Sequence, residues 1–256
     1  MSGVLECSEV AKSFGGLQAA KGISFNLTEG EIVGVIGANG AGKTTLLNVI
    51  SGYLAPDVGS VKLHGVEITG WKPRRIKQQG VGRSFQIPQV FGSFTALENI
   101  MLAQAGALDR GLSWLLPFND EQRAAEALQL LESFGLQAYS ESPAQIMPHG
   151  ARKLVDIVVA LAANPQLVLL DEPTSGVSAD EKDQVMSMLW GTFRSGGATV
   201  LFIEHDMDLV ERYATRVIAL YEGAIIADGA PSQVLNQPSV VRFIRGAKYA
   251  KAARHA

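Results

Sequence analysis

The chain has 256 residues, of which 47% are hydrophobic and 18% are charged, and its formal net charge is −3. This length allows a large core, and without a strong excess of Lys and Arg there is no reason to expect nucleic acid as the main ligand. No apolar run approaches the roughly 18 to 20 residues of a membrane-spanning helix, and no basic segment followed by an apolar core marks a secretory signal. The single cysteine, Cys7, suits a reducing cytosol, and we expect it to be a small buried residue of the first strand.

The amino-terminal part reads as an antiparallel sheet. Two segments of alternating apolar and polar residues between Val4 and Leu27 flank Gly15-Gly16, which predicts two strands joined by a turn. Phe14 lies at this turn, where its ring either stacks on an adenine or belongs to the core. The next apolar run, Ile32 to Ile36, predicts a buried strand.

A glycine-rich loop follows that strand and precedes a helix. Its sequence has the spacing G-x(4)-G-K-T and consists of Gly37, Ala38, Asn39, Gly40, Ala41, Gly42, Lys43, Thr44 and Thr45. The glycines let backbone N–H groups converge on an anion without Cβ clashes, and the helix adds its positive end. Lys43 is predicted to reach the β and γ phosphates, and Thr44 to place its hydroxyl on Mg²⁺. The full motif between a strand and a helix favours binding of a nucleoside triphosphate over a plain turn with a surface lysine.

The chain then alternates short strands and helices. We expect a strand at Val61 to Leu63, a short helix that begins at Pro73 and ends near Gly80, and a strand at Val81 to Phe85. Gln86 stands at the end of this last strand. Ligand-binding groups of open parallel sheets gather at the carboxyl ends of strands, so Gln86 is a site candidate, although a glutamine there is otherwise an ordinary loop residue.

Residues 87–164 have helical periodicity, and we interpret them as a helical subdomain inserted in an α/β core. One helix is predicted to start at Asn119 or Asp120 and to stop at Gly135. A second helix is predicted to start at Gly150 and to end before Asn164-Pro165. The positions of this second helix that we expect to face inward are Leu154, Ile157, Val158 and Leu161.

Two further strands end in polar residues. Leu167 to Leu170 is a continuous apolar run, typical of a strand buried on both faces, and Asp171 and Glu172 follow it. Two acids there are costly unless they face a metal or an open cleft. After a helix over residues 180–193, the strand Thr199 to Ile203 is followed by Glu204, His205 and Asp206, which we expect at the same sheet edge.

The carboxyl-terminal part is predicted to hold a hairpin of strands 217–221 and 224–227 and a final helix that begins at Ser232. Basic residues then occur at every third position, at Arg242, Arg245, Lys248, Lys251 and Arg254. On an α-helix this spacing makes no single basic face, so a solvated tail is favoured over a contact with a membrane or a partner.

The order and spacing of these motifs resemble an ATP-binding cassette ATPase, the nucleotide-binding subunit of an ABC transporter. The resemblance runs to about Gly246, and within the family the segments Gly82 to Pro88, Leu97 to Asn99 and Ile203 to Asp208 are most similar to the branched-chain amino-acid uptake group. It implies a P-loop NTPase (RecA-like) α/β core, residues 1–86 and 165–246, with an amino-terminal antiparallel β subdomain. It also implies a helical signature subdomain at 87–164 and leaves 247–256 as a basic tail.

The resemblance also implies roles for the site candidates, with ATP and Mg²⁺ as the bound groups. Glu172 is similar to the general base that orients the attacking water, and Asp171 to the Mg²⁺ ligand beside it. His205 resembles the residue that contacts the γ phosphate. Gln86 senses Mg²⁺ and the water and links the core to the helical insert, and Phe14 takes the place of the adenine-stacking aromatic residue. The implied partners are membrane-embedded permease subunits and a second ABC ATPase subunit, identical or not, at the cytoplasmic face of the inner membrane.

The chain departs from the family pattern at two places. The family signature Leu-Ser-Gly-Gly-Gln, which reaches the partner subunit's ATP, aligns with Met147 to Ala151. Pro148 has neither the serine hydroxyl nor an N–H, whereas Gly150 is retained and the helix that it opens can still aim backbone amides at a phosphate. His149 either donates a compensating hydrogen bond or is a bystander. Ser178 stands where the family usually has aspartate, and together these departures suggest an asymmetric pair of subunits.

Two functions remain open on the sequence alone. The first is an energy-coupling ATPase of a transporter, and the second is a regulatory nucleotide-binding subunit whose altered signature permits binding with little turnover. A DNA-repair or translation ATPase is disfavoured because the chain has no long coiled-coil insert and no second cassette. A GTPase is disfavoured because no Asn-Lys-x-Asp motif occurs.

Overall fold

The computed structural model describes residues 3–107 and 121–246, and the chain divides into two compact units. The first unit joins Met1–Ile76 to Gly197–Ala256, and the second is Lys77–Gly196. The subdomain limits that the sequence suggests, with the helical part at 87–164, stay a prediction. The basic tail at 247–256 lies outside the described residues.

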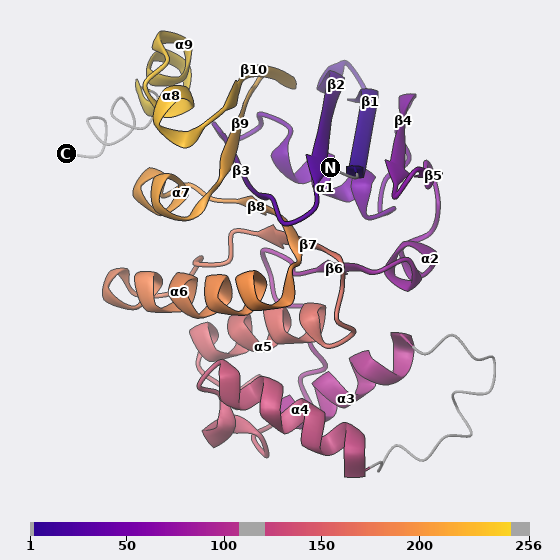
Figure 1. The fold of residues 1–256 in the computed structure, drawn as a ribbon, viewed down its shortest axis with the longest axis vertical. Helices are drawn as coiled ribbons and strands as arrows, with labels where there is room; N and C mark the ends of the chain where they lie inside the picture. Colours follow the sequence, from indigo (N-terminus) through magenta and orange to yellow (C-terminus); the bar gives the residue numbers. More distant parts are fainter. Residues whose placement is uncertain (1–2, 108–120, 247–256) are drawn as a thin grey trace. The chain divides into compact units, whose positions relative to one another are not determined.

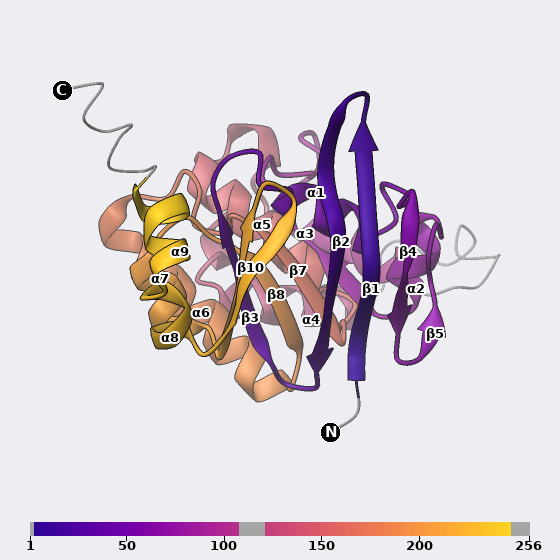
Figure 2. The ribbon, with the colours of Figure 1, turned by 90° about the horizontal axis from the view of Figure 1, so that it is seen from above.

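An antiparallel sheet in the first unit has the strand order β2-β1-β4-β5. Its strands are β1 (Gly3–Phe14), β2 (Leu17–Thr28), β4 (Val58–Leu63) and β5 (Val66–Glu67). The strands β1 and β2 form the long hairpin that is prominent in Figure 2, and its last paired residues are Phe14 and Leu17. Gly15 adopts a φ of 58° in the turn, which a residue with a Cβ rarely does. The predicted antiparallel sheet and its turn are confirmed.

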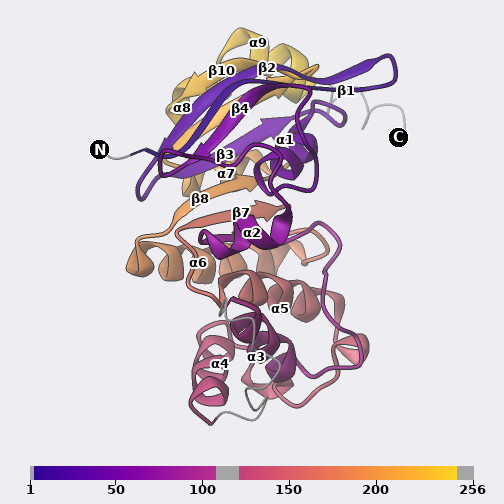
Figure 3. The same cartoon turned by 90° about the vertical axis from the view of Figure 1, so that its right-hand side faces the viewer.

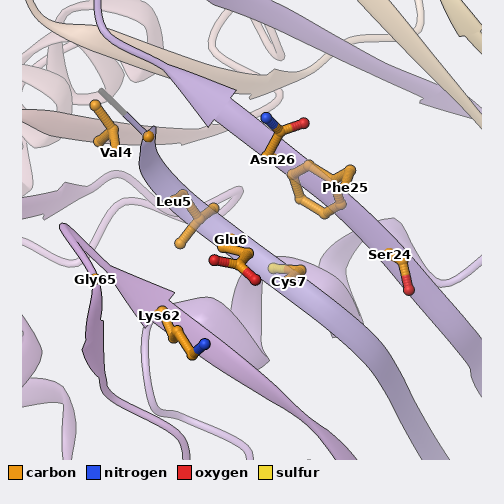
Figure 4. Close-up of a pocket in the computed structure, with 10 residues that line it drawn as sticks. Val4, Leu5, Glu6, Cys7, Ser24, Phe25, Asn26, Lys62 and Gly65 are labelled. Atoms are coloured by element: carbon orange, nitrogen blue, oxygen red, sulfur yellow. The ribbon is translucent and has the colours of Figure 1, made fainter. Parts of the chain in front are cut away.

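Cys7 lies in β1 beside a pocket that is also lined by residues of β2 and β4 (Figure 4). The side chain of Cys7 is buried, and the desolvation that burial imposes raises the pKa of its thiol above the ordinary value. Cys7 is therefore the inert apolar core residue that the sequence predicts.

A second set of strands in the first unit has the order β10-β9-β3-β8. The strand β3 (Ile32–Gly37) runs parallel to β8 (Thr199–Ile203) on one side and to β9 (Arg216–Tyr221) on the other, whereas β10 (Ala224–Gly229) is antiparallel to β9. Every residue of β3 and β8 is buried, which explains their continuous apolar sequences. The helices of this unit are α1 (Lys43–Ile50), α7 (Met207–Tyr213), α8 (Pro231–Leu235), α9 (Pro238–Val240) and η4 (Val241–Arg245), and α2 (Pro73–Gln78) begins in it.

The second unit combines a parallel strand pair with helices. Its strands are β6 (Val81–Arg83) and β7 (Leu167–Asp171), and its helices are α3 (Ala96–Ala107), α4 (Glu121–Ser133), η2 (Gln137–Tyr139), η3 (Ala144–Ile146), α5 (His149–Leu161) and α6 (Ala179–Gly196). The helices α3, α4 and α5 pack on one another, as Figure 3 shows. The predicted strand at Val81 to Phe85 is too long, because the N–H of Phe85 donates to the Asp156 carboxylate instead of to the neighbouring strand.

The predicted helices of this unit are confirmed where the structure describes them. The predicted start of α4 at Asn119 or Asp120 lies outside the described residues, and its predicted stop is Gly135, which adopts a φ of 64°. The helix α5 begins one residue before Gly150, and the predicted inward positions are all buried. The helices α3 and α7 are absent from the sequence prediction.

Candidate nucleotide site

The glycine-rich loop connects the end of β3 to the start of α1 (Figure 1). Gly42 adopts a φ of 95°, and a Cβ placed there would lie 2.1 Å from the carbonyl oxygen of Ala19 in β2. A Cβ on Gly37 would lie 2.5 Å from the carbonyl oxygen of Leu220 in β9. Both contacts are too short for any side chain, so only glycine lets the loop approach β2 and β9 this closely.

Lys43, the first residue of α1, folds back over the loop. Its side chain is 7% exposed, and its Nζ donates to the carbonyl oxygens of Gly37 and Ala38 at 2.8 and 3.1 Å. Thr44 is exposed and Thr45 is half-buried. The helix α1 has no side-chain cap, and the backbone N–H groups of an uncapped first turn suit an anion.

His205 lies at the same sheet edge as the loop, because β8 runs parallel beside β3 and both strands end there. Val35 of β3 pairs with Ile203 of β8, two residues before His205. The His205 side chain is half-buried, and its backbone N–H donates to the buried Glu204 carboxylate at 2.9 Å. The first unit therefore brings together the loop and His205, as the sequence predicts for the carboxyl ends of parallel strands.

Phe14 is 46% exposed at the end of the β1–β2 hairpin. The Lys12 ammonium lies 5.9 Å from the centroid of its ring. This exposure excludes the core interpretation of Phe14 and leaves part of the side chain accessible to a ligand.

In the second unit, Gln86 and Glu172 meet at the carboxyl ends of β6 and β7. These strands are parallel, and Arg83 pairs with Leu169. The Gln86 Nε2 donates to the Glu172 Oε2 at 3.1 Å. Glu172 has a φ of 50°, a conformation that non-glycine residues seldom adopt and that clusters at functional sites. The structure thus joins two site candidates that are 86 positions apart in the sequence.

Asp171, directly before Glu172, is 2% exposed, and its Oδ2 lies 4.0 Å from the guanidinium of Arg83 in β6. The sequence prediction missed Arg83, although a cation two residues after Val81 within a predicted strand was a usable signal, because a buried charge needs a partner. The prediction also missed Lys153 and Asp156, which are both buried in α5. Their signal was a pair of opposite charges three residues apart within an apolar helix face.

The altered signature segment forms the start of α5. Pro148 is the amino-terminal cap residue, no side chain caps the helix, and Gly150 lies in the first turn. A Cβ on Gly176 would lie 2.5 Å from the Nδ1 of His149, so the imidazole packs directly on the backbone of Gly176. The loop that follows the carboxylates therefore contacts the signature segment through His149.

The candidate Mg²⁺ ligands are of the types that this ion prefers. Thr44 offers a hydroxyl, Gln86 an amide oxygen and Asp171 a carboxylate. Mg²⁺ is usually bound by one or two carboxylates together with substrate phosphates and water, so oxygen donors of these types suit it without a dense acidic cage. In the part of the chain that the structure describes, no group of three or more His, Cys, Asp or Glu side chains forms a metal cluster.

The glycine loop between a buried parallel strand and a helix, with acids at the end of another such strand, defines a P-loop nucleoside triphosphatase. The family model described as ABC transporter matches residues 20–175. The chain is 33% identical to the high-affinity branched-chain amino acid transport ATP-binding protein BraF of Pseudomonas aeruginosa, over 95% of this chain and 98% of that protein.

Solved structures give the same result. An ADP-bound ATP-binding cassette of an ABC transporter is 31% identical and has a TM-score of 0.83, with 95% of this chain and 98% of that chain covered. A dimeric cassette with ADP and Pi is 26% identical and has a TM-score of 0.79, with coverages of 89% and 98%. The chain therefore belongs to the ABC transporter ATP-binding family and is an ATPase with the P-loop α/β fold.

Among the described residues, no helix combines the length and the apolar character that a bilayer crossing requires.

Proposed function

We propose that this chain hydrolyses ATP to power an importer of branched-chain amino acids or related small polar solutes. The substrate class rests on BraF, whose name assigns it to branched-chain amino acid transport and which matches this chain over nearly its whole length. The sequence segments around Gln86 and His205 point to the same group. Import itself follows from this resemblance.

The observation that carries the hydrolytic part of the proposal is the hydrogen bond between Gln86 and Glu172. A general base must be held in a defined orientation toward the water that it activates. Glu172 is held by its position after a buried strand and by the amide of Gln86. In this role Glu172 would orient the water that attacks the γ phosphate. Gln86 would sense whether Mg²⁺ and that water are bound.

The remaining roles follow the chemistry of the residues. Phe14 stacks on the adenine, the loop from Gly37 to Thr45 binds the phosphates, and Lys43 exchanges its two carbonyl acceptors for phosphate oxygens. His205 contacts the γ phosphate. Thr44, Gln86 and Asp171 would hold Mg²⁺, which would neutralise charge on the phosphate oxygens.

The proposed partners are permease subunits and a second ABC ATPase subunit. The permease would dock near Gln86, where Ile87 and Phe91 expose large apolar side chains. A dimeric relative supports pairing of two cassettes, in which Pro148 to Ala151 would face the partner's ATP. This placement puts the chain at the cytoplasmic face of the inner membrane, peripherally bound.

We further propose that the pair is asymmetric. The chain's own phosphate loop, Glu172 and His205 match the family pattern, so a partner with a complete signature would give a competent site there. The partner's phosphate loop would face Pro148, which supplies no hydroxyl. In mixed dimers, Glu172→Gln in this chain is then expected to lower turnover more than the equivalent change in the partner, and equal losses would remove the asymmetry.

The decisive experiment is ATP hydrolysis and leucine uptake by proteoliposomes that contain this chain, its dimer partner and the permease subunits. We expect hydrolysis that increases when substrate is delivered, and uptake that stops with Glu172→Gln. This substitution should keep ATP bound and lower turnover by about 10² to 10⁴-fold, the range for loss of a general base. ATP binding without hydrolysis or uptake in the complete complex would favour the regulatory subunit instead.

A further inference from the structure

The helix α5 carries two buried charged side chains on one face. Lys153 is 0% exposed and Asp156 is 2% exposed, and both lie in the middle of the helix. Positions three apart on an α-helix project from the same side. A buried charge is retained only where partners compensate its desolvation, so both residues need an explanation.

Lys153 holds the ends of two strands with one ammonium group. Its Nζ donates to the carbonyl oxygens of Phe85 at 2.5 Å, Asp171 at 3.1 Å and Gln86 at 3.3 Å. An ammonium group has three N–H donors, and these three carbonyls match that number. Two of the carbonyls follow β6 and the third ends β7.

Asp156 binds the same segment by accepting hydrogen bonds from backbone N–H groups of that segment. Its two carboxylate oxygens accept hydrogen bonds from the backbone N–H of Phe85 at 2.9 Å and of Gln89 at 2.7 Å. Hydrogen bonds to an ionised group are stronger than those between neutral groups. The segment Phe85 to Gln89 is therefore fixed to α5 at both its donors and its acceptors.

These contacts flank the pair that is proposed to carry out hydrolysis. The carbonyl of Gln86 itself is bound by Lys153, and the bound carbonyl of Asp171 immediately precedes Glu172. The side chains of Gln86 and Glu172 then meet at 3.1 Å. Lys153 therefore binds the backbone next to both side chains of this contact.

We propose that Lys153 is a positioning residue for ATP hydrolysis, which holds Gln86 and Glu172 in register and connects them to the altered signature at the start of α5. This inference rests on the proposed function. Lys153 and Asp156 form a clamp on the backbone beside Gln86 and Glu172. Gly150, in the segment that would face the partner's ATP, is three residues from Lys153, which is about 4.5 Å along the helix. Contact of a partner nucleotide with α5 would in this way change the geometry of Glu172 in the same chain.

A purely structural role for Lys153 predicts different behaviour. A methionine of similar length fills the same space without the cost of a buried charge, and such replacements are often neutral for stability. A positioning role instead predicts that turnover falls while ATP affinity changes little, because Lys153 binds the backbone that orients Gln86 and Glu172, whereas the phosphate loop supplies most of the affinity.

The test compares Lys153→Met, Lys153→Arg and a control, Arg123→Met, which removes a charge from α4 outside the clamp. ATP affinity, KM, kcat and thermal unfolding are measured for the chain in its complex with partner and permease. We expect Lys153→Met to lower kcat by about 10 to 100-fold, the cost of a misplaced reacting group, with ATP affinity changed by less than about threefold. Lys153→Arg should restore part of kcat, and Arg123→Met should leave it unchanged.

A second measurement tests whether Lys153 acts through Glu172. In a Glu172→Gln background, Lys153→Met is expected to lower the residual rate by less than about twofold, because residues that act through one group are not additive. A full additional loss in that background would overturn the proposal, as would unchanged kcat in a folded Lys153→Met. If Lys153→Met does not fold, Asp156→Asn, which keeps one acceptor for the same segment, must show the fall in kcat at constant ATP affinity.

Failure of the inference is distinguishable from failure of the proposed function. An inactive wild-type complex contradicts the proposed function. An active wild-type complex with an equally active Lys153→Met contradicts only the positioning role.

Discussion

Two helices of the molecule begin at segments that are predicted to bind nucleotide phosphates, and they begin in different ways. The helix α1 follows a glycine loop, and its first residue is a lysine whose ammonium lies over that loop. The helix α5 follows Pro148 and begins with His149, which packs on Gly176. At α1, backbone shape and charge are both supplied locally. At α5, no glycine loop precedes the helix and no lysine is its first residue, so the loop shape and the ammonium group that α1 has are both missing at its start.

This difference shows which positions can vary. Gly42 before α1 is fixed by sterics, because the carbonyl oxygen of Ala19 lies where any Cβ would be. The start of α5 tolerates a proline because a helix cap residue needs no N–H for the helix itself. The interior of α5, with Lys153 and Asp156, is constrained by long-range hydrogen bonds. Sequence change is thus tolerated at the cap residue of α5 and excluded at Gly37 and Gly42 of the loop before α1.

The largest expected effect is that of Gly42→Ala. The new Cβ would lie 2.1 Å from the Ala19 oxygen at a φ of 95°, so the loop must move away from β2. We expect ATP affinity to fall by at least about 100-fold, or about 2.7 kcal/mol, because the converging N–H groups lose their common target. Titration with a fluorescent ATP analogue measures the loss, and circular dichroism checks the fold.

Gly40→Ala is the matched control in the same loop. Its φ of 81° is equally unfavourable for alanine, but a Cβ there has no heavy atom within 4 Å. Only backbone strain of about 1 to 3 kcal/mol remains, and part of it can relax in an open loop. Equal losses of affinity in the two variants would contradict the steric explanation for Gly42.

A smaller effect is expected where α5 meets the loop after the carboxylates. In Gly176→Ala the new Cβ would lie 2.5 Å from the His149 Nδ1 at a φ of 78°, and we expect a loss of about 2 kcal/mol in unfolding free energy. The further change His149→Ala removes the ring contact but not the backbone strain. A double-mutant cycle by denaturant unfolding should therefore return a coupling of about 1 kcal/mol, and strict additivity would rule out the contact.

Much of the fold follows from the sequence because its signals are local. The strands β3, β7 and β8 are continuous apolar runs, and the phosphate loop is a contiguous motif. The helix α7 was not predicted because seven residues give too few turns for a periodic pattern.

The candidate site was less fully predicted, because part of it depends on distant contacts. Gln86 and Glu172 were recognised separately, but their hydrogen bond depends on the pairing of β6 with β7. The clamp formed by Lys153 and Asp156 depends on how α5 lies against those strand ends. No local pattern specifies such a packing.

Pro148→Ser tests whether the start of α5 lacks groups that turnover requires, because it restores a hydroxyl and an N–H at that position. One added hydrogen bond of about 1 kcal/mol predicts about a fivefold gain in turnover at the partner's phosphate loop. The gain is measured in complexes whose copy of this chain carries Glu172→Gln, so that only the partner's site turns over. Pro148→Ala, which restores the N–H alone, is the control and should give a smaller gain. A Pro148→Ser complex no faster than the parent would show that the lost serine does not limit that site.

The smallest effect is a pH dependence inside α5. Burial raises the pKa of the Asp156 carboxyl above its ordinary 3.8, and the hydrogen bonds from Phe85 and Gln89 and the charge of Lys153 oppose this only in part. Because the folded-state pKa exceeds the unfolded one, the folded chain binds more protons, and this residue's contribution to stability falls as pH rises through that interval. Asp156→Asn carries a hydrogen-bonding cost that does not titrate. Its deficit in melting temperature relative to wild type should therefore shrink as pH rises from about 3.5 toward neutrality, and a deficit that widens over this range would mean that the backbone N–H groups, rather than burial, control the carboxyl.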